Sequence, residues 1–378
     1  ETLDAIDKLV FFVDESGSAT GAREALVCPQ PLHPFGRGHF DGVRQPRSYS
    51  SENLQAAKAL LSPDEEAPFF MKEPLSEEAS ISRELSLDDI SRFFGNPSQY
   101  FLRNRLGMNL WEEDPPPEES EPFEIAGLYG YKLRESLLRL AIGVADGDDP
   151  EILCRAEGSL PPGSLGATWF NQARCEVKFF MEKWKESLQG RKSDPLPFEG
   201  ELGGFVLGGE IGPMIGGRQV LFRSADLKAK DRLDAWLRHL CAAAFLPDLD
   251  IATSLFSKNK KKEFATLPAD HAREQLELLL ALYEEGMRKA LPFFAESSLA
   301  YFEEKRKEGE DPPKSASPNL MGAMVKARSK WDGGMFSRGE KRDPAYQLCF
   351  RDEPFGVPAF GELAEMIYGP MIEAEEQE

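Results

Sequence analysis

Residues 201–245 read ELGGFVLGGEIGPMIGGRQVLFRSADLKAKDRLDAWLRHLCAAAF, and this stretch decides the fold. Its glycine-rich apolar start predicts a β-strand, residues 210–217 predict a turn, and residues 218–223 predict a second strand, so the three parts should form a hairpin. The apolar period then changes to that of a helix, for which Ser224 and Asp226 are candidate N-caps. Six residues share one face of this helix and should be buried against the sheet: Leu233, Trp236, Leu237, Leu240, Cys241 and Ala244.

Helical patterns dominate the chain around this stretch. We therefore expect an α/β (α+β) fold that is helix-rich, with a small central mixed sheet on which the helices pack. Amphipathic segments predict helices at residues 53–61, 127–145, 164–188, 271–290, 297–307, 321–331 and 360–372.

Composition limits the class of protein. The 378 residues carry a net charge of −20, and 41% of them are hydrophobic, which is enough for a core in two or three lobes. No apolar run approaches the roughly 20 residues that span a membrane, and the first residues lack the features of a signal peptide. Five separated cysteines without a CxxC pair, and four histidines without ligand spacing, argue against a disulfide framework or a zinc site. We expect a cytoplasmic protein that has no metal and no other cofactor.

The order of strand, turn, strand and helix has a chemical interpretation. Metal-dependent nucleases of the PD-(D/E)xK type place an acid on the first strand and an acid-x-Lys on the second, where they hold Mg²⁺ and activate water. Leu207 stands at the first acid's position, and Arg223 stands near the second's. Asp226-x-Lys228 comes a few residues late, so we interpret it as a helix cap and a solvated lysine. The alternative is an unorthodox magnesium site built from Glu201, Glu210, Asp226 and Lys228.

A second informative stretch, residues 85–107, reads LSLDDISRFFGNPSQYFLRNRLG. Ser86 should cap a helix that ends at Gly95, and Pro97 should open the next one. The stretch resembles the signature that opens the nuclease domains of helicase–nuclease repair complexes. In some of those domains a cysteine before the proline anchors an iron–sulfur cluster. Here that residue is Asn96, so the resemblance implies no cluster.

Further segments narrow the resemblance. They are PLHPF at residues 31–35 with SYS at 48–50, LPPGSLG at 160–166, Trp236-Leu237-x-His239-Leu240, and residues 280–292. In this order and spacing they resemble the C-terminal third of the exodeoxyribonuclease V gamma chain family, RecC, over about residues 26–370.

The resemblance implies a degenerate PD-(D/E)xK nuclease fold that has lost its catalytic residues. Active relatives place a histidine in the helix after the glycine-rich turn, whereas this chain has Trp169 and Phe170 near that place. We expect residues 1–84 to be a proline-rich lead-in from a preceding helicase-like region, with an early strand that ends at Cys28. Residues 85–378 would be the nuclease-like domain, with a linker near 111–122. The first residue is a glutamate, which suggests a fragment of a longer protein or a processed one.

The implied function is a non-catalytic structural and strand-guiding domain of the gamma subunit of the exodeoxyribonuclease V helicase–nuclease complex, in double-strand break repair and homologous recombination. Its implied partners are the beta and alpha chains and DNA. Two alternatives remain open: an active magnesium-dependent nuclease with the unorthodox site, and an interaction module that does not touch DNA.

A lone basic run such as residues 258–262 is more often a solvated loop than a phosphate contact. The candidate DNA-binding residues are Arg103, Arg105, Arg218, Arg223, Lys258, Lys260, Lys261 and Lys262.

Overall fold

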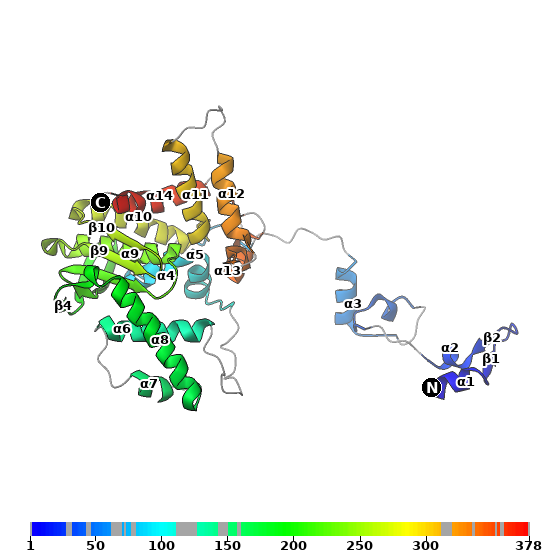
Figure 1. Cartoon of the computed structure of the whole chain (residues 1–378). Coiled ribbons are helices and arrows are strands. Elements are labelled where there is room, and N and C mark those ends of the chain that lie inside the picture. Colours follow the sequence, from blue (N-terminus) through cyan, green and yellow to red (C-terminus); the bar gives the residue numbers. More distant parts are fainter. Residues whose placement is uncertain are drawn as a thin grey trace. The chain divides into compact units, whose positions relative to one another are not determined.

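The chain forms two compact units in a computed structural model, Glu1–Pro68 and Phe69–Glu378. Figure 1 shows the elements of each unit. The division falls 16 residues before the boundary that we expected from the sequence. The described residues are 2–27, 32–42, 47–61, 70–71, 73–76, 81–110, 127–142, 150–156, 160–310, 320–334, 337–351, 354–355 and 359–376. Residues 111–122, which we expected to be a linker, lie outside these ranges.

The first unit is small and has short elements. A hairpin pairs β1 with β2, and its turn is closed by the Asp14 carboxylate, which accepts from the backbone N–H groups of Ser16 and Ser18. The chain then enters a helix rather than the strand that we expected to end at Cys28, and Cys28 itself lies outside the described residues. Ser50 caps α3, because its Oγ accepts from the Asn53 N–H at 3.2 Å. The elements are α1 (Thr2–Asp7), β1 (Phe11–Val13), β2 (Ala19–Gly21), α2 (Ala22–Leu26), the 3₁₀ helix η1 (Arg37–His39) and α3 (Ser51–Ala59).

The second unit contains most of the regular structure. Its elements up to the end of the central sheets are β3 (Glu84–Ser86), α4 (Leu87–Gly95), α5 (Pro97–Tyr100), the π-helix η2 (Phe101–Arg105), α6 (Gly127–Ile142), α7 (Pro150–Ala156), α8 (Gly163–Lys183), η3 (Glu186–Leu188), β4 (Lys192–Ser193), β5 (Leu196–Leu202), β6 (Phe205–Ile211), β7 (Met214–Ile215), β8 (Arg218–Arg223), α9 (Ala229–Phe245), η4 (Pro247–Leu249), β9 (Thr253–Ser257) and β10 (Lys261–Phe264). The remaining elements are α10 (Ala269–Gly286), α11 (Ala295–Glu310), α12 (Leu320–Asp332), β11 (Gly333–Gly334), β12 (Ser337–Arg338), η5 (Glu340–Arg342), α13 (Pro344–Phe350) and α14 (Ala359–Glu376).

Two mixed sheets lie at the centre of this unit, which confirms the predicted fold class. One sheet has the strand order β3-β6-β5, and the other has the order β10-β9-β8-β7-β4. The β3–β6 and β8–β9 pairs are parallel, and the remaining pairs in the two sheets are antiparallel. The crossover that joins β8 to β9 contains α9, so these three elements form a β-α-β unit.

The predicted pairing within residues 201–223 is wrong. The glycine-rich run is not one strand, because Leu202 pairs with Phe205 across a tight turn of Gly203 and Gly204. Both glycines have positive φ, at 55° and 77°, a conformation that a residue with a Cβ adopts only under strain. The strand that follows, β6, pairs with β5 and β3, whereas β8 pairs with β7 and β9 in the other sheet. Pro213, which lies two residues after the last residue of β6, has no N–H to continue the ladder.

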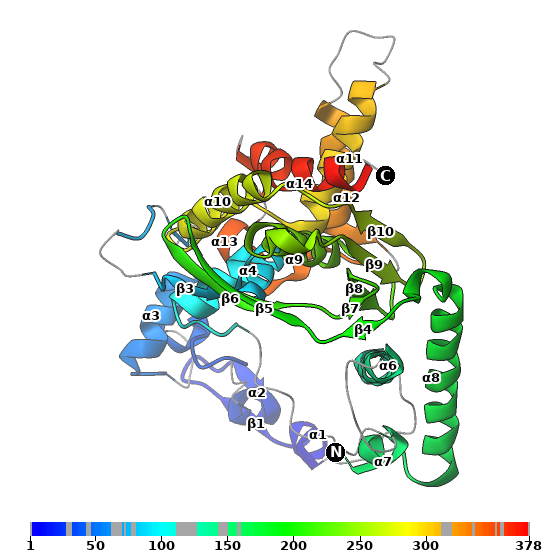
Figure 2. The same cartoon turned by 90° about the vertical axis from the view of Figure 1, so that its left-hand side faces the viewer.

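The core lies between the sheets and the helices that cover them. In Figure 2, α9 and α10 lie on one side of the strands, and α6 and α8 lie on the other. The six residues predicted on the inner face of α9 are all buried, which confirms that helix. A second cluster joins α6 and α8 to the five-stranded sheet, where Leu138 and Phe180 belong with Val220 and Phe256. The strands of the five-stranded sheet are therefore covered by helices on both sides.

The predicted N-caps of α9 are wrong. The helix begins at Ala229, after both Ser224 and Asp226, and the N–H groups at its start are satisfied by one carboxylate of its own first turn and one from α11. The Asp231 carboxylate accepts from the Lys228 N–H at 2.8 Å, and the Glu296 carboxylate on α11 accepts from the Ala229 N–H at 3.0 Å. By contrast, Ser86 caps α4 as predicted, with Asp89 completing a capping box.

Candidate functional site

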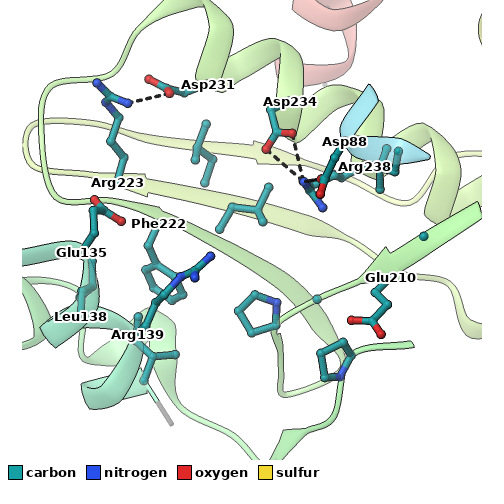
Figure 3. A pocket seen from close by; sticks show the side chains of 18 of the residues that line it. Asp88, Glu135, Leu138, Arg139, Glu210, Phe222, Arg223, Asp231, Asp234 and Arg238 are labelled. Carbon is teal, nitrogen blue, oxygen red and sulfur yellow. Dashed lines mark hydrogen bonds and ion pairs between the residues drawn. The ribbon is translucent and has the colours of Figure 1, made fainter. Parts of the chain in front are cut away.

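A pocket of about 570 Å³ lies where the ends of β6 and β8 meet α4, α6 and α9 (Figure 3). Apolar side chains such as Leu138 and Leu221 form part of its wall, and charged side chains form much of the rest. The charged residues that line it are Asp88, Glu135, Glu210, Asp231, Asp234, Arg139, Arg223 and Arg238.

The first strand brings no metal ligand to this pocket at the expected position. Leu207 is 1% exposed and belongs to the main core. Two residues further along β6, Gly209 lines the pocket, and an added Cβ there would lie 3.0 Å from the Leu87 Cβ. The strand therefore passes close against α4, and the acid that it does present, Glu210, is exposed.

The second strand ends in an ion pair that joins three elements. The Arg223 guanidinium donates from Nη1 to the Asp231 carboxylate on α9 at 2.8 Å, and from Nε to the Asp226 carbonyl at 2.8 Å. It also lies 5.6 Å from the centre of the Tyr131 ring on α6. The two paired side chains are only 13% and 17% exposed. Burial raises the pKa of Asp231, and the Arg223 charge opposes that shift.

A second arginine holds two further pocket acids. Arg238 on α9 donates to Asp234 one turn earlier and to Asp88 at the start of α4, at 3.0 and 2.7 Å. The Ser91 hydroxyl adds a 2.6 Å bond to the Asp234 carboxylate. Burial acts to lower the pKa of Arg238, but the adjacent Asp234 and Asp88 carboxylates raise it above its usual value. This cluster fastens α4 to α9.

Three of the five carboxylates that line the pocket are paired with arginines. Asp231, Asp234 and Asp88 each accept from an arginine, and the Glu135 carboxylate accepts from the Ser224 N–H at 2.6 Å. Among the residues that the structure describes, no group of three or more His, Cys, Asp or Glu side chains is placed to hold a metal ion. These contacts hold α4, α6 and α9 in place at the end of β8.

The unorthodox magnesium site is not assembled from its predicted parts. Of its four residues, Glu210 lines the pocket, whereas Glu201, Asp226 and Lys228 do not. Glu201 is exposed on β5, and Lys228 is the exposed residue that precedes α9.

The sequence analysis missed the acids and arginines of α6 and α9 that fill this pocket. Their sequence signal was an acid and an arginine four residues apart on a helix, Glu135 with Arg139 and Asp234 with Arg238, which is usual for a surface ion pair.

Comparison with known proteins identifies the family. A family model described as the RecC C-terminal domain matches residues 82–306, more than half of the chain. The chain belongs to the RecC C-terminal domain family.

Curated relatives agree. The RecBCD enzyme subunit RecC of Escherichia coli (strain K12) is 26% identical over an alignment of 370 residues that covers 95% of this chain and 31% of that protein. The subunit of the same name from Mycobacterium tuberculosis (strain CDC 1551 / Oshkosh) is 25% identical over an alignment, gaps included, of 401 residues that covers 99% of this chain and 34% of that protein. The chain thus spans about one third of the length of these relatives.

One solved structure, of a proposed exonuclease from Eubacterium rectale, is 12% identical and covers 54% of this chain and 81% of its own. Its TM-score of 0.34 is too low to support an argument about fold or activity. In the described part of the chain, each helix is too short or too polar to cross a bilayer.

The candidate DNA-binding residues of this RecC domain have different surroundings. Four of them form ion pairs: Arg218 and Lys261 with Glu263, Lys262 with Glu375, and Arg223 with Asp231. Lys258 and Lys260 are exposed at the turn between β9 and β10, although Lys261 and Lys262 belong to β10 and not to a loop. Arg103 is exposed in the middle of η2, and Arg105, its last residue, is half-buried.

Proposed function

We propose that this chain is the C-terminal part of a RecC subunit. It would act as a non-catalytic structural and strand-guiding domain of a RecBCD-type complex, exodeoxyribonuclease V, in double-strand break repair and homologous recombination. Its partners would be the beta and alpha chains of that complex and DNA, in the cytoplasm. The relatives named RecBCD enzyme subunit RecC, which align with nearly all of this chain, support this assignment.

The observation that carries the non-catalytic part is the Arg223–Asp231 ion pair at the end of β8. A hydrolytic magnesium site needs carboxylate oxygens that are free to bind the ion. At the end of β8, the Arg223 guanidinium is paired with the Asp231 carboxylate and would repel a divalent cation. Since Leu207 offers no oxygen on β6, two ligand positions are filled by side chains that stabilise the fold.

The pocket then has a structural role. Arg223 and Glu135 connect β8 to α6, and Arg238 connects α9 to α4. A platform that is fixed in this way can hold a partner chain or a DNA strand in a constant position without cutting it.

A cleavage assay tests the proposal. The purified chain is incubated with single-stranded and double-stranded DNA ends in the presence of Mg²⁺ or Mn²⁺, and we expect no product. The Leu207→Asp variant should also be inactive, because the second acid would still be missing. Cleavage that disappears in the double variant Glu210→Ala, Asp226→Ala would overturn the proposal in favour of the unorthodox magnesium site. Cleavage that survives in this variant indicates a contaminating nuclease.

Assembly of the complex tests the structural and strand-guiding part of the proposal. The chain, joined to the rest of a RecC subunit, is mixed with beta and alpha chains and separated by size. We expect a stable complex whose unwinding of DNA depends on this domain. A complex that unwinds DNA equally well without the domain would contradict the strand-guiding role.

A further inference from the structure

Helices α11 and α12 form an antiparallel pair that projects from the body of the second unit (Figure 1). The inner side of α12 belongs to a cluster with Phe294 and Tyr301, to which it contributes Ala323, Ala327 and Trp331. This helix lies beyond residues 82–306, to which the family model extends.

The outer side of α12 is strongly basic. Lys326, Arg328 and Lys330 are exposed, and none of them forms an ion pair with another described residue. Two further exposed cations lie beside the helix. Arg338 on β12 pairs in register with Gly333, which directly follows α12, and Arg342 belongs to η5, which packs against α12. We call these five cations the α12 basic surface.

Two of the three acids of the same segment are engaged in hydrogen bonds within the protein. Within residues 320–334 and 337–351, the acidic residues are Asp332, Glu340 and Asp343. Glu340 accepts from the Glu296 and Ser297 N–H groups at the start of α11, at 3.0 and 2.9 Å. Asp343 accepts from the Ala345 N–H and from the Asn96 side chain. Asp332 alone among these three is exposed, so the cations keep their charge at the surface.

This basic surface belongs to a chain whose net charge is −20. On β8 and β10, the cations that the sequence suggested for DNA are paired with Glu263, Asp231 or Glu375. On the neighbouring helix, Lys305 is paired with Glu365 of α14. A basic surface within an acidic molecule attracts a polyanion locally while the remaining surface repels it, which restricts where the polyanion can bind.

The arrangement of the cations fits a phosphate backbone that crosses the helix. Lys326 and Lys330 are about 40° apart around the helix axis, whereas Arg328 is on the opposite flank, since each residue turns by about 100°. The ridge between the two flanks carries Val325, which is 64% exposed, Ser329 and, at the end of the helix, the exposed Asp332. No aromatic side chain that could stack on a base lies on this ridge, so the contacts would be to phosphates and independent of sequence.

We propose that the α12 basic surface contacts the phosphate backbone of a DNA strand. This inference rests on the proposed function, because it assumes that the domain works beside DNA. It places the contact on α12, β12 and η5, to which none of the candidate residues from the sequence belong.

Binding of fluorescent single-stranded DNA to the whole chain, measured by anisotropy at several salt concentrations, tests the inference. The triple variant Lys326→Gln, Arg328→Gln, Lys330→Gln should bind about tenfold more weakly, and its plot of log Kd against log salt should be shallower by about two, as expected for three lost phosphate contacts. A matched control, Lys132→Gln, Lys178→Gln, Lys230→Gln, changes the net charge equally at exposed sites on α6, α8 and α9. It should keep most of the affinity.

Each other result overturns the inference. Equal losses in the two triple variants would assign the effect to net charge alone. The absence of measurable DNA binding by the unaltered chain at low salt would exclude the surface. Unchanged DNA affinity with lost assembly onto the beta or alpha chain would assign the surface to an acidic protein partner. Because the proposed function is tested by cleavage and assembly, its failure is distinguishable from a failure here.

Discussion

Glu340 is a buried carboxylate with a structural task. Its oxygens accept from two backbone N–H groups and from the Ser297 hydroxyl at the start of α11. Burial raises its pKa from 4.5 to about 7, and the adjacent Glu296 charge adds to this shift, whereas the hydrogen bonds oppose it. The folded protein therefore binds a proton at this site that the unfolded chain releases between pH 4.5 and about 7.

We predict a pH dependence of stability from this residue. Because the folded state holds more protons than the unfolded state in this window, the free energy of unfolding falls as pH rises from 4.5 to about 7. The contribution is about 3 kcal/mol at most. Denaturant unfolding of the wild-type chain and of Glu340→Gln at about pH 5 and about pH 8 measures it. The variant should lose less stability over this range. Parallel curves for the two proteins would show that Glu340 does not titrate in the window.

Trp236 tests the core at the same scale. The side chain is 2% exposed and packs on the rings of His239 and Phe264, at 5.7 and 5.4 Å between centroids. Replacing Trp236 by Ala should lower the free energy of unfolding by roughly 3–5 kcal/mol, because the cavity removes these contacts. The control is Phe179→Ala on α8, where the ring is 79% exposed and the expected change is within about 0.5 kcal/mol. An unchanged melting temperature for Trp236→Ala would mean that α9 is placed wrongly.

The position of α14 depends on one carboxylate at its last turn. Glu375 has a side chain only 2% exposed, and it accepts from Arg232 on α9 through both oxygens, at 2.9 and 2.6 Å, and from Lys262 on β10 at 2.6 Å. Arg232 also donates to Glu303 on α11 at 2.7 Å. This network joins elements from four places in the chain, and its loss would leave Arg232 as a buried charge with one partner fewer.

We predict that Glu375→Ala lowers the free energy of unfolding by about 3 kcal/mol. Hydrogen exchange should also become faster in α14, since local opening would need less energy. The control is Glu373→Ala on the same helix, where the side chain is exposed. If both variants behave alike, helix propensity rather than the ion-pair network explains the change.

The whole molecule has its apolar core in the second unit. In the first unit, Ala22 and Ala57 are the buried apolar residues among those described, whereas all four core clusters belong to the second. Residues 70–84 contribute to that second core, because Phe70, Met71 and Leu75 pack against Phe101 and Leu102, and β3 pairs with β6.

A pair of truncations tests this division. A chain that begins at residue 69 should keep its melting temperature within about 3 °C, because it loses little buried apolar surface. A chain that begins at residue 87 should melt at a clearly lower temperature, since it loses β3 and part of the cluster around Phe101. Equal melting temperatures for the two truncations would favour the boundary near residue 84 that the sequence suggested.

The sequence by itself determined the elements whose signals are local. The buried face of α9, the Ser86 cap of α4, and α5 opened by Pro97 follow from period and capping chemistry, which depend on residues within one or two turns. The absence of a carboxylate at position 207 and the family resemblance also needed only the order of residues.

Tertiary structure alone decided pairing between distant groups. The strands that pair with β6 cannot be identified from neighbouring residues alone. β6 follows the turn at Gly203 and Gly204 and pairs with β5 and β3, whereas β8 belongs to the other sheet. From the sequence, Arg223 and Lys262 were candidates for binding DNA. In the folded chain, Arg223 is paired with Asp231 of α9, and Lys262 is paired with Glu375 of α14. Charges act through space over a few ångströms in surroundings that folding creates, so a pattern along the chain cannot say which cations remain unpaired.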